Sequence, residues 1–218
     1  MIIAIDGPSA SGKSTLGRML ARALKLLYID TGSMYRAVAL ATIEAQLDPS
    51  DKEAVTELAN ELEIDLEGDP ESLSVWLNGR DVTNQIRTEK VTEMSSVVST
   101  IPGVRHAMVQ RQRALSKRGA VLNGRDIGTV VFPDADIKFF LTAGPEARAE
   151  RRYKEDQLTA ASSATFAETL ADINERDRRD STRADSPLKV ADDAIVIDST
   201  GKSIQQVFEE MMERISHG

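Results

Sequence analysis

The chain has 218 residues, enough for one α/β domain with a core and a small insert, and its 41% hydrophobic and 28% charged residues are ordinary for a globular protein. It has no cysteine, which excludes disulfides, zinc–thiolate sites and cysteine nucleophiles. The net charge of −8 argues against general affinity for nucleic acid, and no apolar run approaches the roughly 20 residues that cross a bilayer. The first apolar run is too short for the core of a signal peptide. We therefore expect a cytoplasmic protein, monomeric by default, with no nucleic-acid or membrane partner.

Strand and helix patterns alternate along the chain, which indicates a parallel α/β architecture. The apolar run 2–5 is typical of a central strand buried on both faces, and apolar residues between 16 and 24 recur at helical spacing. We expect further strands at 26–29, 120–123, 137–141 and 194–197, and further helices at about 31–46, 50–60, 102–117, 145–157, 165–179 and after 203. The small, polar segment 159–164 is expected to form a mobile loop between two of these helices.

The pattern changes between about 63 and 88, where apolar residues alternate with polar ones. Within this stretch, Asn78-Gly79 supplies a turn that is compatible with a tight hairpin. We therefore expect a small antiparallel β insert inside the parallel fold.

The segment from Gly7 to Ser14 matches the phosphate-loop pattern G-x-x-x-x-G-K-[ST], between a strand and a helix as that pattern requires. Its glycines let backbone N–H groups converge on phosphate oxygens, and the helix N-terminus adds a positive dipole end. Lys13 is expected to reach the β- and γ-phosphates, and the Ser14 hydroxyl to ligate Mg²⁺. The loop thus predicts binding of ATP with Mg²⁺ through Gly7, Pro8, Ser9, Ala10, Ser11, Gly12, Lys13, Ser14 and Thr15.

A second Gly-Lys-Ser occurs at 201–203, also between a strand and a helix. It lacks the first glycine of the phosphate-loop pattern, so the backbone cradle for an anion is missing. We interpret it as a turn followed by a helix N-cap.

Arginines gather in two stretches on either side of the 159–164 loop: Arg148, Arg151 and Arg152 before it, and Arg176 and Arg183, with Asp180 between them, after it. The spacings of the last three would place them on one helical face, unless the helix ends before Arg183. Guanidinium groups bind phosphate oxygens in pairs and neutralise charge during phosphoryl transfer. Either stretch alone is compatible with a solvated face of salt bridges. The chain has a phosphate loop but lacks the N-K-x-D signature of guanine-specific switches and the L-S-G-G-Q signature of transporter ATPases. In such a chain, the two arginine stretches together favour a small-molecule kinase.

Further segments make a family resemblance specific: Asp-Thr-Gly-Ser-Met-Tyr-Arg at 30–36, Asn-Gly-Arg-Asp-Ile-Gly-Thr-Val-Val-Phe-Pro at 123–133, and Glu-Arg-Asp-Arg-Arg-Asp-Ser-Thr-Arg at 175–183. With these and the phosphate loop, essentially the whole chain resembles the bacterial cytidylate kinases, a family of nucleoside monophosphate kinases. The resemblance implies a three-layer P-loop fold with a five-stranded parallel sheet in a single domain, 1–218, with a monophosphate-binding insert at 63–97 and a helical lid at 148–183. It also implies phosphoryl transfer from ATP to CMP and dCMP.

The resemblance assigns a role to each candidate residue. The acceptor phosphate would be held by Thr31 and Arg36, with a second contact from Arg125, and the cytosine would be read by Asp126, Arg105 and Ser96. Asp180 would accept from a ribose hydroxyl, with Arg176 and Arg183 on sugar or phosphate. Arg148, Arg151 and Arg152 would close over the triphosphate. The catalytic cations would be these three together with Lys13, Arg125 and Arg176. Asp30 would orient a water molecule on Mg²⁺.

Plainer alternatives stay open at this stage. Asp126 would then cap a turn, Arg105 would be a surface residue of its helix, Asp30 would N-cap the following helix, and Ser96 would have no role. For the whole protein, the alternatives are a kinase of another small acceptor, such as shikimate or a different nucleotide, and a non-enzymatic module whose lid is ordered by ATP.

Overall fold

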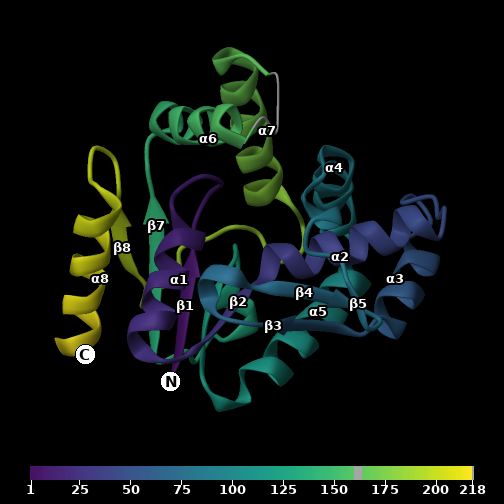
Figure 1. Ribbon diagram of the computed structural model, residues 1–218, viewed down its shortest axis with the longest axis horizontal. Helices are drawn as coiled ribbons and strands as arrows, with labels where there is room; N and C mark the ends of the chain where they lie inside the picture. Colours follow the sequence, from purple (N-terminus) through teal and green to yellow (C-terminus); the bar gives the residue numbers. More distant parts are fainter. Residues whose placement is uncertain (160–163, 218) are drawn as a thin grey trace. The chain divides into compact units, whose positions relative to one another are not determined.

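The computed structural model describes residues 1–159 and 164–217 (Figure 1). The chain forms two compact units: the first is built from residues 1–20 and the described residues after 122, and the second comprises Ala21–Leu122. The predicted five-stranded parallel sheet is confirmed, with the strand order β2-β6-β1-β7-β8, and a three-stranded sheet has the order β3-β4-β5.

The first unit contains β1 (Ile2–Asp6), β7 (Ile137–Thr142) and β8 (Ile195–Asp198). β1 pairs parallel to β7, with Ile3 opposite Ile137, and β7 pairs parallel to β8, with Phe139 opposite Ile195. Ile3 and Ala4 point to opposite faces of β1 and neither has exposed surface, so the strand is covered on both faces. The uninterrupted apolar run therefore forms the central strand that the sequence predicts.

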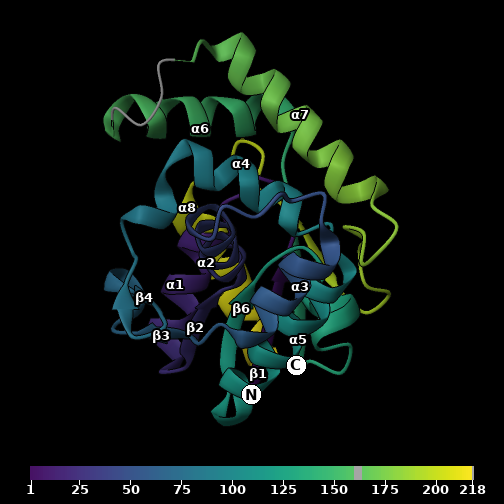
Figure 2. The same ribbon diagram turned by 90° about the vertical axis from the view of Figure 1, so that its right-hand side faces the viewer.

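The helices of the first unit are α6 (Pro145–Thr159), α7 (Phe166–Thr182) and α8 (Ile204–His217), and α1 (Lys13–Leu24) begins in this unit and ends in the other. Figures 1 and 2 both show α6 and α7 side by side, and the Tyr153 ring meets the Phe166 ring edge-on with centroids 6.2 Å apart. α7 begins with a capping box, in which the Thr165 and Glu168 side chains each accept from the other's backbone N–H. Positions 160–163 of the predicted 159–164 loop lie outside the described residues.

The second unit contains β2 (Leu27–Asp30), β3 (Ile64–Glu67), β4 (Ser74–Leu77), β5 (Arg80–Asp81) and β6 (Ala120–Asn123) up to Leu122, with α2 (Thr31–Glu44), α3 (Lys52–Glu61), α4 (Glu89–Val98), α5 (Pro102–Leu115) and short 3₁₀ turns at Pro70–Ser72, Gln85–Arg87 and Ser116–Arg118. β3, β4 and β5 pair antiparallel, so the predicted β insert is confirmed. Asn78 and Gly79 have φ of +50° and +74°, the left-handed conformation that a tight hairpin turn requires.

Three features differ from the sequence expectations. α4 was not predicted, because the polar Ser95 stands between Val91 and Val98 among its buried positions and interrupts the apolar stripe. A π-helical turn, Ile127–Val131, was not predicted either. α7 ends at Thr182, and Arg183 has an extended backbone (φ −62°, ψ 142°), so the prediction that Arg183 shares a helical face with Arg176 and Asp180 is wrong.

None of the helices in the two described ranges combines the length and the apolar composition needed to cross a membrane.

Candidate active site

The phosphate loop connects β1 to α1 through a backbone that only certain residues can adopt. Gly7 and Gly12 have φ of +145° and +96°, and Ala10 between them has φ of +57°. A Cβ on Gly7 would lie 2.0 Å from the carbonyl oxygen of Leu141 in β7, so the loop lies directly against that strand. The first glycine of the pattern therefore serves both conformation and close approach.

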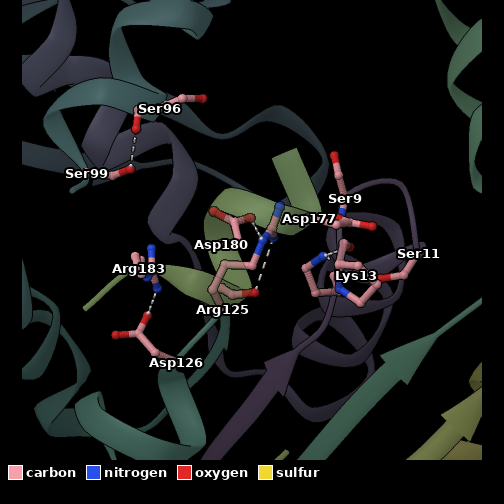
Figure 3. Close-up of polar contacts among 12 residues, drawn as sticks. Ser9, Ser11, Lys13, Ser96, Ser99, Arg125, Asp126, Asp177, Asp180 and Arg183 are labelled. Carbon is pink, nitrogen blue, oxygen red and sulfur yellow. Dashed lines mark hydrogen bonds and ion pairs between the residues drawn. The ribbon is translucent and has the colours of Figure 1, made fainter. Parts of the chain in front are cut away.

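Lys13 is buried at the start of α1, and its ammonium turns back into the loop. Its Nζ donates to the Pro8 carbonyl at 2.5 Å and to Ser11 Oγ at 3.4 Å (Figure 3). Burial lowers the pKa of Lys13 well below its usual range, and the positive charges of Arg125 and Arg176 lower it further, against an opposing effect of Asp6 and Asp180. The surroundings of Lys13 therefore carry an excess of positive charge that a bound anion would offset.

The Ser14 hydroxyl, the predicted Mg²⁺ ligand, has a partner that the sequence analysis did not identify. Asn123 Nδ2, at the end of β6, donates to Ser14 Oγ at 3.0 Å. Asn123 stands at the head of the 123–133 segment, and only the folding of that strand brings it beside a residue 109 positions away.

An arginine of the 123–133 segment pairs with a carboxylate of α7. Arg125 Nε donates to Asp180 Oδ2 at 2.7 Å, and Figure 3 shows the two side chains pointing toward each other. Burial acts to raise the pKa of Asp180, but Arg125, followed by Arg176 and Arg183, outweighs burial and lowers it overall. Asp180 is therefore held as a carboxylate that accepts hydrogen bonds.

Arg183 reaches the site from beyond the end of α7 rather than from its face. Its guanidinium lies 3.7 Å from Asp126 Oδ1, with both side chains 7% exposed, and its Nε donates to the Ser186 carbonyl at 2.6 Å. The helix end thus places Arg183 next to Asp126, which the sequence spacing could not indicate.

The three arginines of α6 have different surroundings. Arg148 is buried, donates to the carbonyls of Ala143 and Ser9, and pairs with Asp177 of α7 at 2.6 Å. Arg151 donates to Ser199 through Oγ at 3.0 Å and through the carbonyl at 2.6 Å, whereas Arg152 is exposed and pairs along its own helix.

Asp177 also belongs to this arrangement, although the sequence analysis did not select it. Its Oδ1 accepts from the Ser9 backbone N–H at 3.4 Å, so α7 contacts the phosphate loop directly. Arg148 and Asp177 together link the loop to both helices of the predicted lid.

The remaining predicted residues belong to the second unit. Thr31 is the buried first residue of α2, and Arg36 lies about one turn further along that helix. Asp30 is the N-cap of α2, with its side chain accepting from the Gly32 N–H at 3.1 Å, as one of the alternatives expected. The role of Asp30 toward Mg²⁺ stays a prediction.

Arg105 and Ser96 also lie in the second unit. Arg105 is 2% exposed, donates to the Ser99 carbonyl at 3.3 Å and stacks over the Tyr35 ring of α2 at 5.6 Å, so it is not a surface residue. Ser96 donates to the Thr92 carbonyl one turn earlier in α4 at 3.4 Å. Neither arrangement tests the proposed contact with a base.

The second Gly-Lys-Ser is a turn and N-cap, as predicted. Gly201 has φ of +70°, and Ser203 Oγ accepts from the Gln206 N–H at 3.2 Å at the start of α8.

Known proteins resemble this chain along nearly its whole length. A sequence model of the family described as cytidylate kinase matches residues 3–217. Curated relatives named cytidylate kinase include those of Citrifermentans bemidjiense, 47% identical over 100% of this chain and 95% of the relative, and of Corynebacterium efficiens, 47% identical over 98% and 93%. Among solved structures, an uncharacterized protein from Eubacterium ventriosum aligns over 99% of this chain and 98% of its own with a TM-score of 0.54 at 12% identity, a likeness of fold alone.

Proposed function

The chain belongs to the cytidylate kinase family, and we propose that it transfers the γ-phosphoryl group of ATP to CMP or dCMP, giving ADP and CDP or dCDP. The observation that supports this most directly is the buried Lys13 in the phosphate loop, whose pKa is lowered by burial and by Arg125 and Arg176. A cluster of cations beneath a loop of converging N–H groups is suited to a polyphosphate.

At the donor end, we propose that residues 7–15 bind the phosphates of ATP and that Lys13 contacts the β- and γ-phosphates. The Ser14 hydroxyl is a hard oxygen ligand of the kind that Mg²⁺ prefers, and Asn123 fixes its position. When bound, Mg²⁺ neutralises part of the phosphate charge. Asp30 would orient a water molecule of the ion.

At the acceptor end, the proposed phosphate ligands are Thr31, Arg36 and Arg125; the proposed base ligands are Asp126, Arg105 and Ser96; and the proposed sugar ligands are Asp180, Arg176 and Arg183. The pairs that Arg125 and Arg183 form keep Asp180 and Asp126 close to fixed cations. An ionised Asp126 accepts hydrogen bonds only, which suits the exocyclic amino group of cytosine.

The reaction needs positioning more than proton transfer. An oxygen of the acceptor phosphate forms a bond to the γ-phosphorus while the bond from that phosphorus to the bridging oxygen of ADP breaks. The acceptor phosphate is already a nucleophile near neutral pH, since its second pKa is about 6 by analogy with phosphoserine. Arg148, Arg151, Arg152 and Arg176 would surround the triphosphate and, with Lys13 and Arg125, spread positive charge over the transferred group.

Arg148 fits this role through its surroundings more directly than Arg152. It already contacts the loop carbonyl of Ser9, whereas Arg152 is exposed and pairs with Asp156. We further propose that residues 63–97 act as the monophosphate-binding insert and 148–183 as a lid within one kinase domain, 1–218, and that the protein works as a monomer in the cytoplasm.

An ATP-coupled assay with CMP, dCMP, UMP and AMP tests the proposal, and we expect turnover with CMP and dCMP. Asp126→Ala should raise the KM for CMP about tenfold or more, because both the base contact and the ion pair with Arg183 are lost, and should leave the affinity for ATP unchanged. Asp134→Ala, an exposed carboxylate on the same stretch, is the matched control. Phosphorylation of shikimate in place of CMP would assign another acceptor, and no CDP at saturating ATP and CMP would favour a non-enzymatic module.

A further inference from the structure

Asp6 is a buried carboxylate to which the sequence analysis gave no role. It is the last residue of β1, immediately before Gly7 opens the phosphate loop, and it is 4% exposed. Its Oδ1 accepts from the Ile127 N–H at 2.8 Å and its Oδ2 from the Gly128 N–H at 2.7 Å. Both oxygens are therefore engaged with a segment 121 positions away that directly follows Arg125 and Asp126.

These two N–H groups are at the start of the π-helical turn Ile127–Val131, where Asp126 occupies the N-cap position. At such a position an aspartate ordinarily accepts from the first free N–H groups of its own helix. The Asp126 side chain makes no such capping hydrogen bond. Asp6, at the end of β1, supplies the acceptors instead, so the Asp126 carboxylate does not cap the turn.

Position 128 leaves little room for a side chain beside Lys138 and Asp6. A Cβ there would lie 3.4 Å from Asp6 Oδ2 and 3.1 Å from Cδ of Lys138, whose ammonium binds Asp193 and the Pro133 carbonyl. Because glycine has no side chain, the Gly128 N–H can approach the Asp6 carboxylate and donate to it.

Keeping a carboxylate here has an electrostatic cost. Burial raises the pKa of Asp6 to about 6, against the Gly128 and Ile127 N–H groups that lower it; the negative charge of Asp126 raises it further and Lys13 lowers it. Because the neutral acid keeps a proton on one oxygen, it holds the two N–H groups less well than the carboxylate does. The ionised form is thus the one that fixes the segment.

We propose that Asp6 is a positioning residue for acceptor recognition, which holds the segment Arg125–Gly128 so that Arg125 and Asp126 are presented to the acceptor nucleotide. The inference rests on the proposed function, since it takes these two residues as acceptor ligands. It adds that the residue which precedes the donor loop also sets the geometry of the acceptor ligands.

The test is Asp6→Asn in the full-length protein, with steady-state kinetics for CMP and ATP between pH 5 and 8. The amide keeps the size of the carboxylate but turns an NH₂ donor toward one of the two N–H groups. We expect the KM for CMP to rise about tenfold at pH 7.5, with the KM for ATP within about twofold of the wild type. The wild-type KM for CMP should also rise as pH falls through about 6, beyond the change that the variant shows.

Asp136→Asn is the matched control, because the exposed Asp136 carboxylate accepts from the Ile2 N–H at the other end of β1 at 2.6 Å. It should leave both KM values unchanged. If Asp6→Asn does not fold, Gly128→Ala is the second variant: its Cβ would crowd Lys138 and touch Asp6 Oδ2, which displaces the Gly128 N–H from the carboxylate and should also raise the KM for CMP selectively.

Two results would overturn the positioning role: KM values for CMP and ATP that rise equally, or a KM for CMP within twofold of the wild type in the folded variant. Wild-type turnover of CMP would in both cases still uphold the proposed function. Absence of CMP turnover by the wild type would instead overturn the proposed function and, with it, this inference.

Discussion

Replacement of Gly7 by alanine is the sharpest test of the phosphate loop. The new Cβ would lie 2.0 Å from the Leu141 carbonyl oxygen and 3.0 Å from its carbon. Both belong to the backbone of a buried strand, so no side-chain rotation relieves the contact, and the loop must move away from β7 by about 1 Å. The φ of +145° adds strain, because residues with a Cβ rarely adopt it.

The expected cost follows from these two terms. Strain at positive φ contributes about 1–2 kcal/mol, and the displacement of packed backbone about 1–3 kcal/mol. Gly201→Ala is the matched control, because Gly201 has φ of +70° but no atom within 4 Å of the added Cβ. Gly7→Ala should therefore lower the free energy of unfolding by about 2–5 kcal/mol and Gly201→Ala by only about 1–2 kcal/mol.

Urea denaturation of both variants measures these differences in unfolding free energy, and titration with ATP measures how well the loop still binds the nucleotide. Since the N–H groups of the loop must point at phosphate oxygens, a shift of about 1 Å should weaken ATP binding at least tenfold. The reasoning fails if Gly7→Ala is no less stable than Gly201→Ala, or if it binds ATP as the wild type does.

Three further predictions concern Asp6, Lys13 and the start of α7. Since burial raises the pKa of Asp6 from 3.8 to about 6, its contribution to the free energy of unfolding is full well below pH 3.8 and is lost as pH rises through about 6. The stability difference between wild type and Asp6→Asn should therefore shift by about 3 kcal/mol between pH 3 and 7 in urea titrations, and a constant difference would contradict it. Lys13→Ala should lower kcat at least about 100-fold in the coupled assay, and retained turnover would argue against its catalytic role. The unfolding free energy at pH 7 should not fall in this variant, because the buried ammonium has too little compensating negative charge around it. Thr165→Ala removes half of the capping box and should cost about 1 kcal/mol by urea denaturation, with Thr182→Ala at the other end of α7 as the control; equal effects would show that the box contributes nothing.

Local patterns account for what the sequence predicted well. The phosphate loop, the buried β1 strand and the Asn78-Gly79 hairpin each depend on residues within about ten positions of one another, so their spacing carries the information. α4 was missed because the polar Ser95 interrupts its buried stripe, and the end of α7 could not be located because no glycine or proline marks it.

The site was only partly visible in the sequence. Lys13, Arg125 and Asp180 were selected from motifs, and the structure brings them into one electrostatic cluster. Asp6 and Asn123 were not selected, because a single polar residue at a strand end has no distinctive pattern of its own.

The donor loop, the α/β alternation and, through the motifs, the family follow from the order of residues along the chain. The tertiary structure decided which side chains meet: Asp6 with the N–H groups of Ile127 and Gly128, and Arg183 with Asp126 from beyond a helix end. Asp6 meets Ile127 because parallel strands place residues 121 positions apart at the same sheet edge, where burial raises the pKa of Asp6. Spacing along the chain contains neither that proximity nor that burial.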